Sequence, residues 1–137
     1  MHEPLWLTYN VVNPVIIHFI GERKPWNFRD PFYKEWRANL RKADLIDLRS
    51  LQPLDTEAIY TSVKKTGRAI ILQEDSLFGG IASDISALIT EHCFESLDAP
   101  VKRVASMETP IPFISQLENQ YLAKGRFSEE LKKLLAY

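Results

Sequence analysis

The feature that most constrains the fold is an alternation of short β-branched apolar runs with segments of helical periodicity. The run Val15–Ile20 ends at Gly21 and predicts a buried strand. Further strands are predicted at Asp44–Leu48, Ala69–Gln73 and Pro100–Ala105, and a weaker pattern near Leu5–Tyr9 would allow one more. Strands that alternate with helices favour right-handed crossovers and helices on both faces of a sheet. The pattern therefore predicts an α/β fold, a three-layer α/β/α sandwich with a mostly parallel sheet, in a single domain over residues 1–137.

Helix boundaries are marked by capping residues and glycines. Asp55 is expected to cap a helix that ends at Thr66, with Gly67 in the left-handed conformation just beyond it. Gly79 and Gly80 are expected to open the next helix. A helix is predicted after Asp30-Pro31, with one face formed by Phe32, Trp36 and Leu40. The helix after Gly80 is expected to bury a stripe of Ile81, Ile85, Leu88, Ile89 and Cys93. The prolines in 109–112 predict an extended segment, and Ser128 is expected to cap a last helix that turns Leu131, Leu134 and Leu135 inward.

Charge and cysteine content exclude several classes of function. The 17 basic and 18 acidic side chains give a net charge of -1, which indicates no general affinity for nucleic acid or anionic membranes. The apolar runs are too short to span a bilayer, and no signal peptide is apparent. Because Cys93 is the only cysteine, no internal disulfide can form and a cytoplasmic location is expected. Its place on an apolar helix face predicts a packed thiol rather than a nucleophile.

From about Ala43 to Tyr137, the chain resembles the transketolase-type C-terminal domain of the beta subunit of 2-oxo acid dehydrogenases, the branched-chain 2-oxoisovalerate enzyme in particular. The resemblance is carried by five stretches of the sequence: LIDLRSLQPLD at 45–55, SVKKTGR at 62–68, GGIASDI at 79–85, APVKRV at 99–104 and ETPIP at 108–112. Glu74-Asp75 and the ending at 131–137 also fit the family.

The resemblance implies a part of an oxidoreductase that is not itself catalytic. In that family, thiamine diphosphate and magnesium are bound by other domains, and this domain assists subunit assembly and docking of the acyltransferase core. It implies that this chain has no catalytic residue, binds no cofactor and shows no activity alone. The expected partners are a second copy, dehydrogenase subunits or the acyltransferase core, and the candidate partner surface comprises Phe78, Phe113 and Tyr137.

The first residues resemble a different family. His18, Gly21, Lys24, Pro25 and Trp26 match the pattern His-x-x-Gly-x-x-Lys-Pro-Trp of the C-terminal segment of family-eight glycosyltransferases. The resemblance implies that a histidine in the position of His18 binds a metal ion, and that it holds a sugar-nucleotide diphosphate together with Gly21 and Lys24. That metal site also needs an Asp-x-Asp pair, which this sequence does not contain. We therefore expect a chimera within one domain, with residues 1–42 glycosyltransferase-like and residues 43–137 transketolase-like.

Two functional alternatives stay open at this point. The first concerns His18, Gly21 and Lys24. These residues either retain some binding of a sugar nucleotide, or His18 is an ordinary strand residue and Lys24 is solvated. The other concerns Glu74-Asp75 beside Gly79-Gly80, which sit at the end of a predicted strand, where ligands gather in α/β folds. These residues are expected to form either an acidic or phosphate-facing site or a structural turn.

Overall fold

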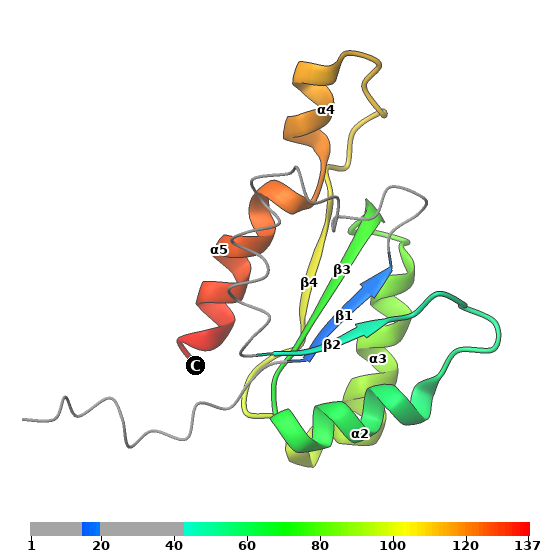
Figure 1. Ribbon diagram of the computed structural model, residues 1–137, viewed down its shortest axis with the longest axis vertical. Helices are drawn as coiled ribbons and strands as arrows, with labels where there is room; N and C mark the ends of the chain where they lie inside the picture. The colour runs from blue at the N-terminus through cyan, green and yellow to red at the C-terminus, as the bar shows by residue number, and fades with distance from the viewer. Residues whose placement is uncertain (1–14, 20–42) are drawn as a thin grey trace, which may run out of the picture.

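The computed structural model describes residues 15–19 and 43–137. Four parallel strands form one sheet in the order β2-β1-β3-β4 (Figure 1). They are β1 (Val15–Phe19), β2 (Asp44–Asp47), β3 (Ala69–Ser76) and β4 (Lys102–Ser106). The helices are α2 (Thr56–Thr66), α3 (Ile81–Cys93), the 3-10 helix η2 (Phe94–Ser96), α4 (Ser115–Tyr121) and α5 (Lys124–Leu135).

The segment at residues 15–19 lies inside the sheet. It pairs with β2 from Val15 to His18 and with β3 from Val15 to Phe19. The strand predicted at 15–20 is thus confirmed, and it joins β2 to the rest of the transketolase-like part. The helix predicted after Pro31 and the weak strand near residues 5–9 lie outside the described residues.

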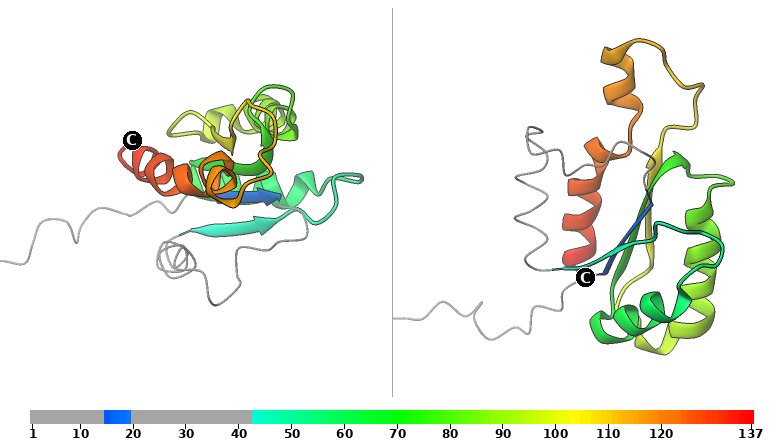
Figure 2. Two further views of the ribbon diagram at one scale, coloured as in Figure 1. Left: turned by 90° about the horizontal axis from the view of Figure 1, so that it is seen from above. Right: turned by 45° about the vertical axis from the view of Figure 1, so that its right-hand side comes forward.

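Two buried layers cover the two faces of the sheet. Side chains alternate along β3, so that Ala69 and Ile71 face the layer formed by α2 and α3. Ile70 and Leu72 face the other layer, where α5 packs (Figure 2). Burial on both faces explains why β3 is a continuous apolar run. The predicted three-layer arrangement with a parallel sheet is confirmed in the described part of the chain.

The capping predictions for α2 are also confirmed. The Asp55 side chain accepts a hydrogen bond from the Ala58 amide at 3.0 Å. Gly67 ends the helix at φ 69°, and its amide donates to the Val63 carbonyl. A Cβ on Gly67 would collide with the Asp98 carboxylate, so this glycine is needed for close packing as well as for its backbone conformation.

Several predicted boundaries are wrong. The last helix begins at Lys124, so Ser128 lies inside it and does not cap it, and Leu135 is 38% exposed while Leu134 is fully buried. Helix α4 was not predicted. β3 continues to Ser76, three residues beyond the expected end, which places Glu74 and Asp75 within the strand on its exposed part. β4 runs from Lys102 to Ser106 rather than from Pro100 to Ala105.

Candidate partner surface

A tight glycine turn connects β3 to α3 at the carboxyl end of the sheet. Gln73 is almost fully buried and makes two hydrogen bonds across this turn: its Nε2 donates to the Ser76 carbonyl at 2.6 Å, and its Oε1 accepts from the Ala82 amide at 2.8 Å. A Cβ on Gly80 would overlap Gln73 Nε2 and press on the Ser76 carbonyl. The buried glutamine closes the turn, and only glycine fits at position 80.

This arrangement distinguishes between the two interpretations of the acidic and glycine-rich segment. The amides of Ala82 and Ser83, which would face a phosphate at the start of α3, already donate to Gln73 and to the Gly80 carbonyl. The Phe78 amide donates to the Glu108 carboxylate, whose charge would repel an anion. The geometry therefore supports the structural turn.

The turn holds residues 77–80, called here the Phe78 loop, at the surface. The Phe78 side chain is 85% exposed, while its amide donates to Glu108 Oε1 at 2.9 Å. Arg103 adds a second support, because its Nη1 donates to Ser83 Oγ at 2.6 Å and to the Leu77 carbonyl at 3.4 Å. Contacts from β4 and from the segment after it thus hold the backbone that carries the exposed Phe78 ring.

Residues 107–121 form an arm that projects beyond the carboxyl end of the sheet (Figures 1 and 2). None of the residues of its helix α4 is buried. At the base of the arm, the Met107 amide donates to the Tyr121 carbonyl at 3.1 Å, and Arg126 Nη2 donates to the carbonyls of Ala105 and Tyr121. The arm is therefore closed at its base and carries its apolar side chains outward.

The arm and the Phe78 loop together make an exposed apolar surface, which we call the apolar end surface. Phe113 is fully exposed and Ile111 is 69% exposed. The hydrogen bond from Phe78 to Glu108 links the loop to the arm, so the two parts belong to one end of the molecule. The surface consists of Leu77, Phe78, Met107, Ile111, Phe113, Ile114 and Leu117.

The three predicted partner-surface residues do not lie together. Phe78 and Phe113 both belong to the apolar end surface. Tyr137 is also exposed, but it follows α5, and the C-terminus lies at the opposite end of that helix from the arm (Figure 1). Tyr137 would therefore contact a partner through a separate part of the surface.

Of the residues proposed for sugar-nucleotide binding, the structure describes only the backbone of His18. His18 lies in β1, where its register partners are Asp47 of β2 and Leu72 of β3. Gly21 and Lys24 lie outside the described residues. Asp47 is itself engaged, since its carboxylate lies 3.5 Å from Arg49 Nε.

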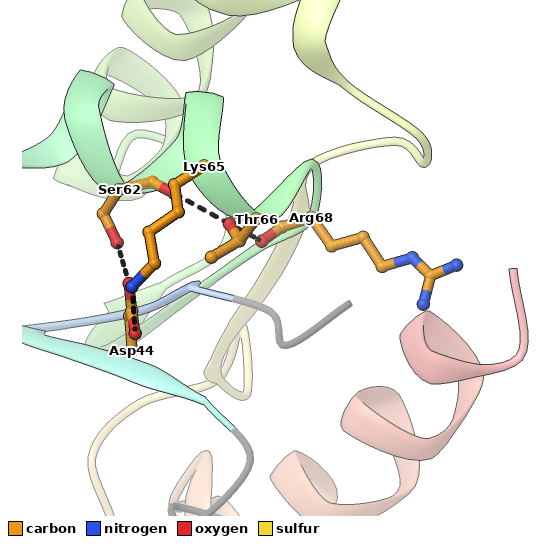
Figure 3. A network of polar contacts seen from close by, with 5 residues as sticks. All are labelled: Asp44, Ser62, Lys65, Thr66 and Arg68. Atoms are coloured by element: carbon orange, nitrogen blue, oxygen red, sulfur yellow. Dashed lines mark hydrogen bonds and ion pairs between the residues drawn. The ribbon is translucent and has the colours of Figure 1, made fainter. Parts of the chain in front are cut away.

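A polar network at the amino end of the sheet is structural (Figure 3). Asp44 at the start of β2 accepts hydrogen bonds from Ser62 Oγ and Lys65 Nζ, both at 3.0 Å. Thr66 Oγ1 donates to the Ser62 carbonyl at 2.9 Å. The side chain of Arg68 points away from Asp44. These contacts tie β2 to the last turn of α2.

Cys93 is a packed thiol, as predicted. It is buried with Ile59, Val63 and Ile89 against α2, and burial raises the pKa of its thiol while Lys64 lowers that pKa by a smaller amount. Lys64 is a basic neighbour that the sequence pattern did not indicate. A thiol held neutral inside the core is a poor nucleophile.

Within 15–19 and 43–137, no group of three or more histidine, cysteine, aspartate or glutamate side chains could hold a metal ion. In the same ranges, no helix has the length and apolar character needed to cross a membrane. What this part of the chain does present is the apolar end surface.

Comparisons with known proteins agree with this fold. The family described as transketolase, C-terminal domain, matches residues 33–126, a range that begins before the predicted start near Ala43. The beta subunit of acetoin:2,6-dichlorophenolindophenol oxidoreductase from Bacillus subtilis is 49% identical over 81 residues, which cover 59% of this chain and 24% of that protein. The mitochondrial 2-oxoisovalerate dehydrogenase subunit beta of Dictyostelium discoideum is 45% identical over 95 residues, which cover 69% of this chain and 25% of that protein.

A solved structure shares the architecture. The split-gene transketolase, described as an inactive beta4 tetramer, matches with a TM-score of 0.69 at 22% identity, covering 91% of this chain and 40% of that one. The chain spans about a quarter of the length of the two curated relatives. The match over residues 33–126, the parallel sheet between helical layers and the homology to 2-oxo acid dehydrogenase beta subunits show that this chain belongs to the transketolase C-terminal domain family.

Proposed function

We propose that this domain is an assembly domain of a beta-type subunit of a thiamine-diphosphate-dependent 2-oxo acid dehydrogenase. The apolar end surface is the observation that carries the proposal. Its two phenylalanines and its aliphatic side chains lie in water at one end of the molecule. Exposed apolar side chains that gather at one part of a protein surface often mark a site where a partner binds.

The same proposal assigns no chemistry to this domain. We infer that thiamine diphosphate and magnesium are held elsewhere in such an enzyme. The role of the domain is to bring subunits together, including those that carry the cofactor. A cytoplasmic location remains a prediction from the single cysteine.

The test measures binding to defined partners. The chain is immobilised and exposed to the purified alpha-type and beta-type subunits and the acyltransferase core of a 2-oxoisovalerate dehydrogenase. We expect one of these to bind, and Phe113→Ser to weaken that binding about 10-fold or more, since a central aromatic side chain is a frequent hot spot. Phe94→Ser is the matched control, because Phe94 is 71% exposed but lies in η2 at the other end of α3.

Two results would contradict the proposal. One is a failure of every subunit to bind at concentrations where the intact enzyme assembles. The other is turnover of 2-oxo acids by the chain alone with added thiamine diphosphate and magnesium. In that case the domain would carry chemistry that we assign to the rest of the enzyme.

A second proposal concerns the origin of the first residues. We propose that residues 1–42 derive from a family-eight glycosyltransferase and were joined to the transketolase-type segment. The motif formed by His18, Gly21 and Lys24 supports it, whereas residues 33–42 already lie within the range that the transketolase family matches.

The corresponding alternative function is residual sugar-nucleotide binding. Calorimetry with a uridine diphosphate sugar and manganese tests it on the whole chain. We expect no heat of binding, because a single imidazole and a lysine supply too few contacts to offset the cost of association. Micromolar affinity that disappears in His18→Ala would favour the glycosyltransferase function over the assembly function.

A further inference from the structure

Packing does not hold the arm in place. Helix α4 has seven residues and buries none of them. The two buried clusters in the described part of the chain include no residue of 107–121. Helices this short are marginal in water and depend on tertiary contacts. The direction of the arm is therefore set by polar contacts near its two ends, where it leaves the sheet and where it returns to α5.

The two ends of the arm meet beside the edge of the sheet. β4 is the last strand of the described sheet, so the outward carbonyl of Ala105 has no neighbouring strand. Arg126 Nη2 donates to this carbonyl and to the carbonyl of Tyr121, the latter at 3.5 Å. The Met107 amide donates to the same Tyr121 carbonyl at 3.1 Å. These four residues, called here the arm base, join the end of β4 to the end of α4.

Arg126 connects the arm base to the core. It lies in the first turn of α5, and the next residue, Phe127, is fully buried in the layer between α5 and the sheet. The backbone that carries Arg126 is thus fixed by packing, and its side chain extends from this helix to the arm. A planar guanidinium holds its N–H groups in a fixed arrangement, so that one nitrogen can donate to two carbonyls at once.

The position of this cation is unfavourable for α5 itself. The amino end of a helix carries a partial positive charge, and acidic side chains are favoured there. The first turn of α5 contains no acidic residue and holds Arg126 instead. The cation therefore does not stabilise its own helix, and what it contacts are the carbonyls of Ala105 and Tyr121. This placement indicates that Arg126 acts on the arm.

From these contacts we propose that Arg126 is a positioning residue, which fixes the direction of the arm and so prepares the apolar end surface for binding. The inference rests on the proposed assembly function and adds to it a residue that lies outside the apolar end surface. A partner that meets a fixed arm does not have to order it. A free arm lowers the apparent affinity by the fraction of time that it spends in the binding direction, so a fraction of about one tenth weakens binding about 10-fold.

Spin labels on the full chain measure the direction of the arm. They are attached at Gln116→Cys in α4 and at Glu95→Cys in η2, two exposed positions, while the buried Cys93 stays unlabelled. We expect the distances between the labels to form a narrow distribution in the otherwise wild-type chain and a broad one when Arg126→Gln is added.

Binding kinetics measure the consequence for the partner. The dehydrogenase subunit that binds the wild type is presented to Arg126→Gln. We expect the association rate to fall about 10-fold with little change in the dissociation rate, because the side chains that contact the partner are all still present. A residue that itself touched the partner would change the dissociation rate instead.

Lys133→Gln is the matched control. It removes one cation from the same helix, and the ion pairs of Lys133 with Glu129 and Glu130 stay within α5. Both measurements should keep their wild-type values in this variant, and circular dichroism confirms that each variant is folded. Should Arg126→Gln not fold, exchange of the Met107 amide in the wild type decides. Slow exchange supports a closed arm base, and exchange as fast as in an unfolded peptide refutes it.

The outcomes separate this inference from the proposed function. A distribution as narrow in Arg126→Gln as in the wild type refutes the positioning role, and so does an unchanged association rate. The labels need no partner. A broadened distribution in a chain whose wild type binds no dehydrogenase subunit would therefore overturn the assembly function and leave Arg126 as the residue that fixes the arm.

Discussion

Replacing Gly80 by alanine should destabilise the protein well beyond the usual effect of a surface substitution. The backbone at Gly80 has φ -82° and ψ 157°, which alanine adopts without strain, so the cost is steric. The added methyl would occupy the position of Gln73 Nε2. To make room, Gln73 must give up its hydrogen bonds with the Ser76 carbonyl and the Ala82 amide.

The magnitude follows from the burial of Gln73. Its side chain is 1% exposed, so groups that lose their partners cannot turn to water. Each unsatisfied buried group costs about 1–3 kcal/mol, and alanine returns about 0.4–1 kcal/mol by restricting the unfolded chain. We expect the free energy of unfolding to fall by about 2–3 kcal/mol. For a chain of this length, that corresponds to a drop in Tm of roughly 8 °C.

Urea denaturation followed by circular dichroism measures this change, with Gly79→Ala as the matched control. Gly79 has φ 76°, and a methyl group added there would meet no atom within 4 Å. Alanine at this position therefore costs only the strain of the left-handed backbone, about 1–2 kcal/mol. The restriction of the unfolded chain by alanine offsets part of this cost. A Gly80→Ala variant no less stable than Gly79→Ala would refute the reasoning. If the loss acts through Gln73, then adding Gln73→Ala to Gly80→Ala should cost far less than Gln73→Ala costs in the wild type.

Three further predictions test the caps and the core. Asp55→Ala should lower the free energy of unfolding by about 1 kcal/mol in a urea titration, because it removes the acceptor for the Ala58 amide. Leu134→Ala should cost about 2–5 kcal/mol and Leu135→Ala less than about 1 kcal/mol, and equal losses would contradict the observed face of α5. Burial raises the pKa of the Cys93 thiol in the folded protein. The stability that the protonated thiol contributes to the folded protein is therefore complete below the ordinary thiol pKa of about 8.5 and is lost as pH rises through the pKa of the folded state. The urea midpoint should fall more steeply above that pH in the wild type than in Cys93→Ala.

Local signals in the sequence were sufficient wherever a structural feature depends on neighbouring residues. Asp55 and Gly67 mark the two ends of α2, because capping and left-handed geometry are properties of a few consecutive residues. The apolar stripe of α3 predicts its buried side in the same way, with Ile85, Ile89 and Cys93 inside. The continuous apolar run of β3 predicts a strand covered on both faces.

Features that depend on distant residues were missed or misplaced. Gln73 gave no sign of its role, since its partners across the turn become neighbours only when β3 and α3 are formed. Helix α4 has no buried face, so no apolar periodicity indicates it. Ser128 has the chemistry of a helix cap, yet the helix starts earlier at Lys124, where packing of Phe127 against the sheet extends it.

The candidate partner surface also combines features that the sequence predicts with features that depend on the fold. Phe78 and Phe113 could be chosen from the sequence as apolar residues of a domain expected to contact partners. Only the tertiary structure brings the Phe78 loop and the arm to one end of the sheet, through the bond from the Phe78 amide to Glu108, thirty residues away along the chain. The sequence determined which segments form strands and helices, because those depend on local periodicity and caps. The tertiary structure decided which side chains stay in water together, because exposure depends on what the whole fold leaves uncovered.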